Sequence, residues 1–351
     1  MKFLVNISRV IVGILFIFSG LIKANDPLGL SYKMQEFFEV WGRDPSVTTF
    51  MSWLHEYALP FSIIMITLEV IVGVALLVGI WKKFVSGLLL LLIIFFSFLT
   101  GYAVLSGKIA TCGCFGDCIP LTAMQSFIKD IVLVLLILLI YFGRKYIQPL
   151  FTPIVNLVVV IISTILVLFF QWYVLRHLPV IDCLPFKKGN NILELRKMPA
   201  DAIPDKKDFI FTYKKDGKEK QFKRGEMPDS TWEFVSREDV ILEKGKNNEP
   251  PIKDFYLTPN DGADSTEELL SQPGKYYLLF VKEPPTPDAD WINSFEHLLN
   301  KTTAEGTAIY VVTSRVTDVN RFFNEQHSYQ VPVFGLDATA LKTAARTNPQ
   351  L

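Results

Sequence analysis

Three of the four cysteines in this chain of 351 residues lie within seven consecutive positions, in the segment Thr111-Cys112-Gly113-Cys114-Phe115-Gly116-Asp117-Cys118. A disulfide between Cys112 and Cys114 would close a very small ring. Disulfide geometry is narrow, so such a bond would be strained and easily reduced. The two glycines give the backbone the freedom that a close approach of sulfur atoms requires. The pattern favours thiol–disulfide exchange, in which a partner opens one pair and the third sulfur, at Cys118, resolves the mixed disulfide.

The fourth cysteine, Cys183, could join this chemistry as a further thiol. Three other interpretations remain open. The cysteines could form two structural disulfides, they could hold zinc as a Cys₄ site with His177 nearby, or Cys183 could take no part. Zinc is the least favoured, because the Cys-x-Cys spacing is atypical for its sites. We therefore expect no metal site, and the sequence does not decide whether the protein is an enzyme.

The elements that position these cysteines are apolar runs long enough to cross a bilayer, which takes about 20 helical residues. Residues 1–176 carry only 20 of the 70 charged side chains, whereas the remaining 175 residues carry 50. The net charge is zero, which gives no electrostatic argument for nucleic-acid binding. The first half is expected to lie in the lipid bilayer through five helices: Phe3–Ile22, Leu59–Ile80, Phe84–Leu105, Ser126–Phe142 and Ile154–Leu175.

Basic residues in the short loops predict the orientation of these helices. The pairs Lys82-Lys83 and Arg144-Lys145 join successive helices without any acidic residue, so both loops are expected on the cytoplasmic side. The N-terminus then lies inside, and residues 106–125 and everything after Arg176 lie outside. We therefore expect a multi-pass protein of the cytoplasmic (inner) membrane, with its cysteines and its polar half on the side that permits disulfides.

One acidic residue, Glu69, falls midway along the second predicted helix. An ionisable group at that depth is costly and points to function, here as a possible intramembrane proton site. A protonated carboxyl that is hydrogen-bonded inside the bundle is an equally good interpretation. Arg9 and Lys23 lie near helix ends and are expected to extend toward the membrane surface. The outer loop 23–58 has helical spacing, which predicts either surface helices or a lid on the bundle.

The polar half begins with a linker rich in proline and glycine at 183–205. Alternating residues on both sides of Asp216-Gly217 predict a hairpin, and Trp232–Leu242 could add a strand. From Pro251 the chain alternates between buried strands and helices, which predicts a largely parallel sheet. The predicted strands are Tyr276–Val281, Thr307–Val312 and Val331–Leu336, and the predicted helices are Asp290–Asn300, Val316–Phe323 and Ala338–Arg346.

Three stretches of the first half resemble known membrane families. The run Arg9–Lys23 followed by Asn-Asp-Pro27, and Glu69-x-x-x-Gly73 with Leu77-Val-Gly79, resemble DoxX-type proteins. Cys112-Gly-Cys-Phe-Gly116 resembles the related MauE type, named for methylamine utilisation. The MauE resemblance implies maturation of a disulfide-rich enzyme together with a thioredoxin-like partner, with Cys112, Cys114 and Cys118 redox-active. The helical core is also similar to that of quinone-linked disulfide-forming enzymes, but their Cys-x-x-Cys is missing here, which argues against a quinone cofactor.

Residues 251–351 resemble a thioredoxin-like domain of the peroxiredoxin and TlpA type, through Pro251–Leu257, Asp261-Gly262 and Gly274–Phe280. The place of the Cys-x-x-Cys holds Glu283–Trp291 without cysteine, so the domain is expected to be redox-dead. Asn348-Pro349 resembles the approach to the family's cis-proline, and the chain stops two residues later. We expect either a truncated sequence or an incomplete sheet.

The expected architecture is therefore a membrane α-helical bundle (1–176), a linker and β-hairpin subdomain (177–250), and an α/β thioredoxin-like domain outside the cytoplasm (251–351). The favoured function is a membrane thiol–disulfide relay or maturation factor, whose thioredoxin-like domain docks an envelope protein. Two alternatives remain: a membrane scaffold with structural cysteines that recruits a partner, and a small-molecule or ion pathway that uses Glu69. Fold resemblance alone does not fix chemistry.

Overall fold

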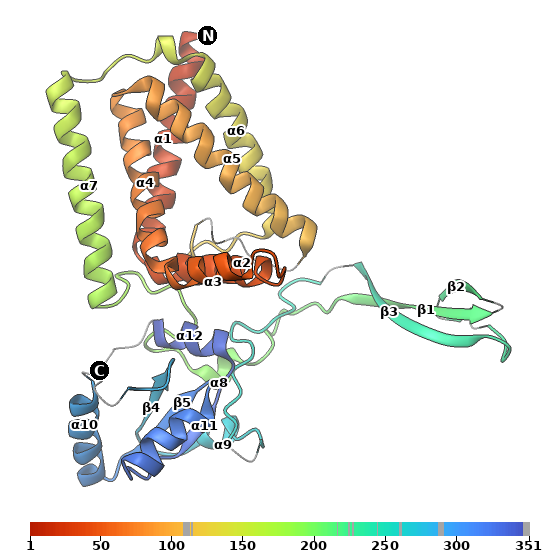
Figure 1. Cartoon of the computed structure of the whole chain (residues 1–351). Coiled ribbons are helices and arrows are strands. Elements are labelled where there is room, and N and C mark those ends of the chain that lie inside the picture. Colours follow the sequence, from red (N-terminus) through yellow and green to blue (C-terminus); the bar gives the residue numbers. More distant parts are fainter. Residues whose placement is uncertain are drawn as a thin grey trace. The chain divides into compact units, whose positions relative to one another are not determined.

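The computed structural model describes residues 1–107, 113, 115–215, 217–223, 225–226, 228–243, 245–259, 262–286 and 291–346 (Figure 1). Within these ranges the side chains of Lys207 and Ile241 are not described. The chain forms two compact units, of which the first spans Met1–Leu184 and also takes in Arg346. The second spans Pro185–Ala345. Each unit has its own helices, and the strands belong to the second unit.

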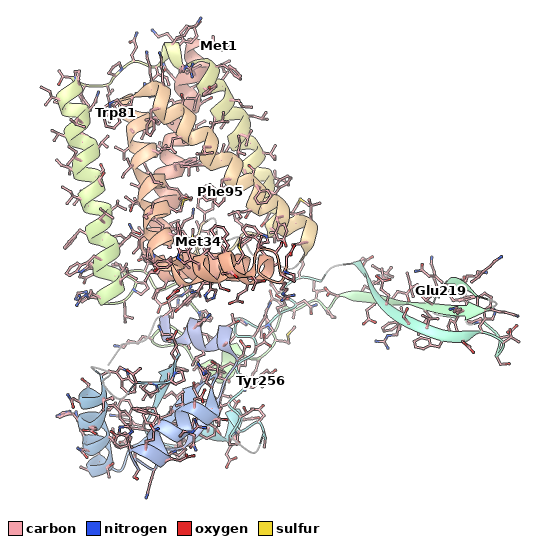
Figure 2. The ribbon with its side chains drawn as sticks, in the orientation of Figure 1. Met1, Met34, Trp81, Phe95, Glu219 and Tyr256 are labelled. Carbon is pink, nitrogen blue, oxygen red and sulfur yellow. A yellow bond between two sulfur atoms is a disulfide. The ribbon has the colours of Figure 1, made fainter. Side chains whose placement is uncertain are left out.

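The first unit contains five long apolar helices, which confirms the five predicted spans and makes this a multi-pass membrane protein. They are 20 to 25 residues long, enough to cross a bilayer. Large apolar side chains such as Phe95 are exposed on their outer surfaces, as a lipid-facing surface requires (Figure 2). The helices are α1 (Lys2–Ala24), α4 (Ala58–Val78), α5 (Lys82–Ser106), α6 (Ala123–Phe142) and α7 (Pro153–Arg176), with a 3₁₀ turn η1 (Arg144–Tyr146) between the last two.

Helices α1 and α4 approach each other closely because glycines lie at their crossing. A Cβ atom added at Gly73 of α4 would lie 2.9 Å from the carbonyl oxygen of Gly13 and 3.1 Å from the backbone nitrogen of Ile17. Close backbone approach through small residues is a common way for membrane helices to pack. The glycine of the Glu69-x-x-x-Gly73 pattern therefore serves packing, which brings Glu69 against α1.

Two shorter helices, α2 (Pro27–Trp41) and α3 (Thr48–Glu56), lie across one end of this bundle (Figure 1). Helix α2 begins at a capped turn, where Oδ1 of Asp26 accepts a hydrogen bond from Gly29 N at 3.0 Å. It buries Phe37 against the ring of Tyr102 on α5. Helix α3 buries no residue. The lid interpretation of loop 23–58 therefore holds for α2, whereas the side chains of α3 are exposed or only partly buried.

The second unit contains an antiparallel sheet of β1 (Lys206–Lys215), β2 (Lys218–Lys223) and β3 (Glu233–Glu243), in the order β2-β1-β3. The hairpin closes with Lys215 opposite Lys218, and Gly217 in the turn has a positive φ of 77°. This confirms the predicted hairpin and its additional strand. Aromatic rings pack across the strands, with Tyr213 against Phe222 at 5.8 Å.

The rest of this unit is a small α/β region with a parallel sheet, as predicted. Its strands β4 (Tyr276–Val281), β5 (Ala308–Thr313) and β6 (Val333–Gly335) pair in that order. Phe255, Phe295 and Phe323 are fully buried around it. The thioredoxin-like interpretation stays a prediction. The helices are α8 (Ile192–Leu195), α9 (Thr266–Ser271), α10 (Ile292–Glu305), α11 (Val316–Asn320), the π-helical turn η2 (Arg321–Gln326) and α12 (Ala338–Arg346).

Candidate functional site

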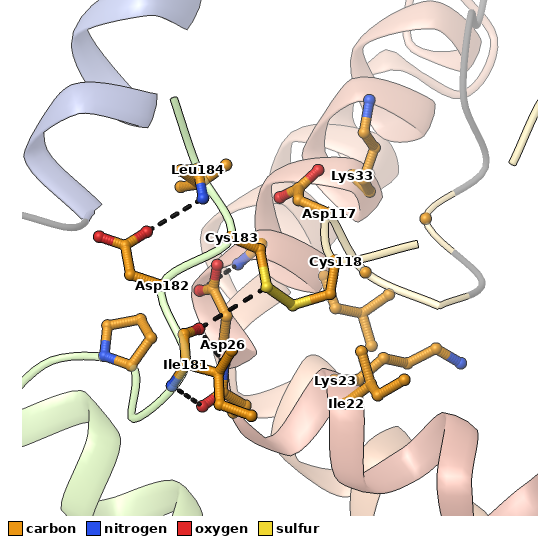
Figure 3. A pocket seen from close by; sticks show the side chains of 16 residues that line it. Ile22, Lys23, Asp26, Lys33, Asp117, Cys118, Ile181, Asp182, Cys183 and Leu184 are labelled. Atoms are coloured by element: carbon orange, nitrogen blue, oxygen red, sulfur yellow. Dashed lines mark hydrogen bonds between the residues drawn. A yellow bond between two sulfur atoms is a disulfide. The ribbon is translucent and has the colours of Figure 1, made fainter. Parts of the chain in front are cut away.

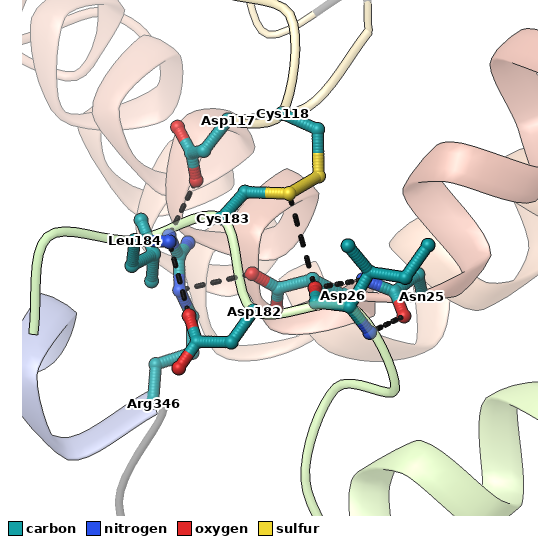
Figure 4. The surroundings of a disulfide bond; sticks show 9 residues. Asn25, Asp26, Asp117, Cys118, Asp182, Cys183, Leu184 and Arg346 are labelled. Atoms are coloured by element: carbon teal, nitrogen blue, oxygen red, sulfur yellow. Dashed lines mark hydrogen bonds and ion pairs between the residues drawn. A yellow bond between two sulfur atoms is a disulfide. The ribbon is translucent and has the colours of Figure 1, made fainter. Parts of the chain in front are cut away.

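A disulfide joins Cys118 of the cysteine-rich segment to Cys183, with 4.9 Å between their Cα atoms (Figure 4). It connects the loop between α5 and α6 to the segment that follows α7. The interpretation in which Cys183 takes no part is therefore wrong. The bond also removes two of the four thiolates that a Cys₄ zinc site needs. Cys112 and Cys114 lie outside the described residues, so their redox role stays a prediction.

The loop that carries Cys118 is shaped by glycines and by a helix cap. Gly113 and Gly116 adopt φ values of 65° and 57°, which favour glycine, and Gly116 N donates to Gly113 O at 3.0 Å. Helix α6 then begins at Thr122, whose Oγ1 accepts from Gln125 N, while the Gln125 side chain accepts from Thr122 N. This capping box fixes the chain four residues after Cys118.

A small cavity of about 20 Å³ lies beside the disulfide (Figure 3). This volume holds about one water molecule. Both cysteines line it, together with Lys23, Asn25 and Asp26. Cys118 and Cys183 are only half-buried, so an exchange partner would reach the sulfur atoms from the surface rather than enter this cavity.

Acidic groups surround the disulfide (Figure 4). Burial raises the pKa of Asp26, and the nearby charges of Asp117 and Asp182 act in the same direction. The guanidinium of Arg346 acts in the opposite direction, because its Nε lies 3.1 Å from Asp26 Oδ2 and it also contacts Asp117. Among the described residues no group of His, Cys, Asp and Glu is arranged to hold a metal ion.

The membrane bundle buries an ion pair between Glu69 of α4 and Lys23 of α1. Lys23 Nζ lies 2.5 Å from Glu69 Oε1, and the two side chains are 5% and 3% exposed. Ser19 Oγ also donates to Glu69 Oε2 at 3.3 Å. The expectation that Lys23 extends to the membrane surface is therefore wrong. The Glu69 carboxyl therefore has partners inside the bundle, because α1 places the Lys23 ammonium group and the Ser19 hydroxyl against it, and its role as a proton site stays a prediction.

Arg9 extends toward the end of the bundle, as expected, and finds backbone partners there. Its guanidinium donates to the carbonyl oxygens of Leu76 and Leu77 at 2.8 and 2.5 Å, and to that of Gln148 at 3.0 Å. Leu76 and Leu77 lie in the last turn of α4, where carbonyl groups have no partner within the helix. Arg9 therefore fastens the N-terminal half of α1 to the C-terminal end of α4, whereas Lys23 lies near the other end of α1.

A second ion pair, in which the carboxylate is buried and the lysine only partly so, lies close to the first. Lys129 Nζ lies 2.7 Å from Asp130 Oδ1, and Asp130 Oδ2 accepts from Thr100 Oγ1 of α5 at 3.0 Å. Both pairs line one cavity of about 30 Å³, which has room for about two water molecules. Phe115 of the cysteine motif also lines this cavity, and its ring centre lies 5.2 Å from Lys129 Nζ. Both residues lie near the start of the predicted span Ser126–Phe142, and no role was predicted for either.

Lys23 lines both cavities, the one beside the disulfide and the one between the two ion pairs. Polar groups therefore continue from the half-exposed sulfur atoms to the middle of the bundle. The sequence analysis did not find this arrangement. The sequence feature that could have pointed to this arrangement is the segment from Lys23 to Pro27. Its polar residues Lys23, Asn25 and Asp26 each contact a different partner.

Comparisons with known proteins agree with the membrane part of this description. Residues 1–143 match the family described as methylamine utilisation protein MauE. Residues 208–244, which hold β1 to β3, match a domain of unknown function, DUF8463. The chain is 35% identical over 85 residues to the protein TlpB of Flavobacterium psychrophilum.

The match to TlpB covers 23% of this chain and 23% of that protein, so the chain spans under a quarter of this curated relative. No solved structure matches the chain. The DoxX and thioredoxin-like resemblances stay predictions. The match over 1–143 and the five apolar helices together support a multi-pass membrane protein whose N-terminal part is similar to the MauE family.

Proposed function

We propose that this protein is a membrane thiol–disulfide relay or maturation factor, which exchanges disulfides with an envelope partner through the segment Cys112–Cys118. The observation that carries the proposal is the disulfide between Cys118 and Cys183. It places an oxidised sulfur four residues along the chain from Cys114 and six from Cys112. All four cysteines of the chain therefore belong to this segment or are bonded to it.

The exchange would proceed by known thiol chemistry. A thiolate of the partner attacks one sulfur of the Cys118–Cys183 bond, which breaks, and a mixed disulfide forms while the released thiolate takes up a proton. The second thiol of the partner then attacks the mixed disulfide, so that the partner leaves oxidised and both cysteines are reduced. Two electrons and two protons pass from the partner to the pair. A disulfide between Cys112 and Cys114 would restore the Cys118–Cys183 bond by intramolecular exchange: the reduced pair becomes oxidised, and Cys112 and Cys114 are left as the two thiols, so this step needs no external oxidant.

The first test measures which sulfur atoms are redox-active. The full-length protein in lipid nanodiscs is treated briefly with limiting dithiothreitol, alkylated, and mapped by mass spectrometry. We expect a pair within the set of four cysteines to open at reductant concentrations that leave ordinary structural disulfides closed. A Cys118–Cys183 bond that resists this treatment, in a protein whose other two cysteines also do not change, would overturn the proposal.

The second test looks for the mixed disulfide itself. Cys114 is a nearby thiol that can attack the mixed disulfide and displace the partner unchanged, so Cys114→Ser should let this intermediate accumulate, and the intermediate should disappear on reduction. A second variant replaces both Cys112 and Cys114 by Ser. Trapping should persist in it, because the partner attacks the Cys118–Cys183 bond, which this variant retains. Absence of any trapped species in all the single cysteine variants would also count against a relay.

A scaffold with structural cysteines is the second candidate, and one observation favours it: the disulfide fastens the α5–α6 loop to the chain after α7. In that case replacing Cys118 and Cys183 together by Ser would lower the melting temperature. Binding of a partner by the α/β region would remain. Under the relay the same variant would lose thiol exchange.

A further inference from the structure

The side chain of Asn25 holds the segment that carries Cys183. Its Nδ2 donates to the carbonyl oxygen of Ile181 at 2.8 Å, and its Oδ1 accepts from Ile181 N at 3.0 Å. The residue is only 6% exposed, directly after the last turn of α1. Both polar atoms of this buried amide are therefore hydrogen-bonded to the backbone of Ile181, which fixes the position of Ile181 against α1.

Ile181 lies two residues before Cys183, and Asn25 lines the same small cavity as both sulfur-bearing residues (Figure 3). The segment is thus held twice in the first unit. The disulfide fastens it to the α5–α6 loop, and Asn25 fastens it to α1. When the disulfide opens, the pair of hydrogen bonds from Asn25 is what remains to keep this segment near Cys118.

We infer that Asn25 is a positioning residue for the Cys118–Cys183 pair, which keeps the two thiols at a high effective concentration and so makes their disulfide harder to reduce. Holding two reacting groups in place converts their encounter into an intramolecular step whose equilibrium depends on the effective concentration. A free segment must lose conformational entropy each time the bond closes. With Asn25 in place, the segment has already lost most of that conformational entropy before the disulfide closes. The role of Asn25 in disulfide exchange with a partner rests on the proposed relay. Its effect on how easily the Cys118–Cys183 disulfide is reduced does not.

The size of the effect has an upper limit. Two hydrogen bonds contribute about 1 kcal/mol each, which corresponds to about a thirtyfold factor in an equilibrium constant. The full factor applies only if ordering the segment in the reduced state costs as much free energy as the two hydrogen bonds contribute. We expect removal of Asn25 to favour reduction by about three- to thirtyfold. At 29.6 mV per tenfold change for a two-electron couple, this raises the reduction potential by about 14 to 44 mV.

The experiment measures the equilibrium between the Cys118–Cys183 disulfide and glutathione. Two glutathione thiols supply two electrons and two protons, giving two protein thiols and one glutathione disulfide. Full-length protein with Cys112 and Cys114 replaced by Ser is equilibrated in nanodiscs over a series of glutathione buffers, then alkylated and quantified by mass. Asn25→Ala should shift the midpoint toward easier reduction. Asn25→Asp keeps the acceptor for Ile181 N and should shift it less.

A matched control is available in the second unit. Asn324 makes the same pair of hydrogen bonds to a backbone residue, with Nδ2 donating to Val331 O at 2.8 Å and Oδ1 accepting from Val331 N at 2.9 Å. Asn324→Ala loses the same bonds and should leave the midpoint unchanged. If Asn25→Ala does not fold, judged by its melting temperature, Asn25→Asp decides.

A midpoint for the Asn25 variants within threefold of the parent would overturn the inference, since the segment would then be equally ordered in the reduced state with and without Asn25. The same shift in Asn324→Ala would also overturn it, because the effect would not be local. Failure of the relay shows differently. In that case the Asn25 variants shift the midpoint while no partner is ever trapped by Cys114→Ser.

Discussion

Replacing Glu69 by Gln should destabilise the membrane bundle far more than most single polar substitutions. The change removes the negative charge that faces Lys23 and leaves the rest of the side chain in place. Lys23 Nζ lies 2.5 Å from the Glu69 carboxylate, and the lysine side chain is 5% exposed. The ammonium group therefore cannot reach bulk water without a shift of α1. Its other close neighbour, the ring of Phe96 at 5.1 Å, offers only a weak cation–π contact.

Breaking a buried ion pair by removing one partner costs about 3–5 kcal/mol, because an uncompensated charge remains. Removing both charges is a different matter, since well-packed apolar replacements for a buried pair are often neutral in stability. We therefore expect Glu69→Gln to cost about 3–5 kcal/mol. The double variant Lys23→Met with Glu69→Gln should recover most of that loss.

The assay is reversible unfolding of the full-length protein in mixed micelles, titrated with sodium dodecyl sulfate. The control is Glu36→Gln, which breaks the Lys33–Glu36 pair. That pair has a similar N–O distance of 2.9 Å, but its side chains are 27% and 37% exposed. Exposed pairs contribute less than about 1 kcal/mol. The contrast between Glu69 and Glu36 isolates the effect of burial.

A cost below about 1 kcal/mol for Glu69→Gln would refute this reasoning, since it would mean that Lys23 finds another partner or reaches the membrane surface. The same variants test the expected proton site. If the double variant is stable but loses thiol exchange, Glu69 or Lys23 takes part in proton transfer. If exchange is retained, the pair is structural.

Two further predictions use other contacts. Gly73→Ala should cost about 1–3 kcal/mol by overpacking the α1–α4 crossing, whereas Gly87→Ala, whose added Cβ meets nothing within 4 Å, should be neutral or stabilising in the same unfolding titration. Because burial raises the pKa of Asp26 above its ordinary value of 3.8, the folded chain binds more protons than the unfolded chain just above pH 4, and this contribution to stability falls as the pH rises through that window. Asp26→Asn should flatten the melting temperature against pH there; an equally steep curve would show that other groups are responsible.

The membrane part was largely predictable from the sequence because hydrophobic length is a local property. Each span needs about 20 apolar residues in succession, and no knowledge of neighbours is required to find them. The helix from Ile154 to Leu175, for example, was placed within one residue of its observed ends, Pro153 and Arg176. The same holds for the β hairpin, where the Asp216-Gly217 turn lies between alternating runs.

The cysteine motif was also visible in the sequence, but its bonding was not. Four cysteines allow three connectivities, and the spacing drew attention to Cys112 and Cys114. The observed bond instead joins Cys118 to Cys183, across 65 residues. Only the return of the chain through α7 brings these two cysteines together.

The partners of the buried charges depended entirely on tertiary structure. The sequence placed Glu69 at membrane depth, and so identified it as costly, but Lys23 is 46 residues away and was assigned to the membrane surface. Likewise Asn25 holds Ile181 across 156 residues. Local hydrophobicity and turn chemistry set the elements of this protein. Which ammonium, amide or sulfur meets another was decided by helix packing, because a polar group in an apolar bundle is stable only beside a partner that the fold brings to it.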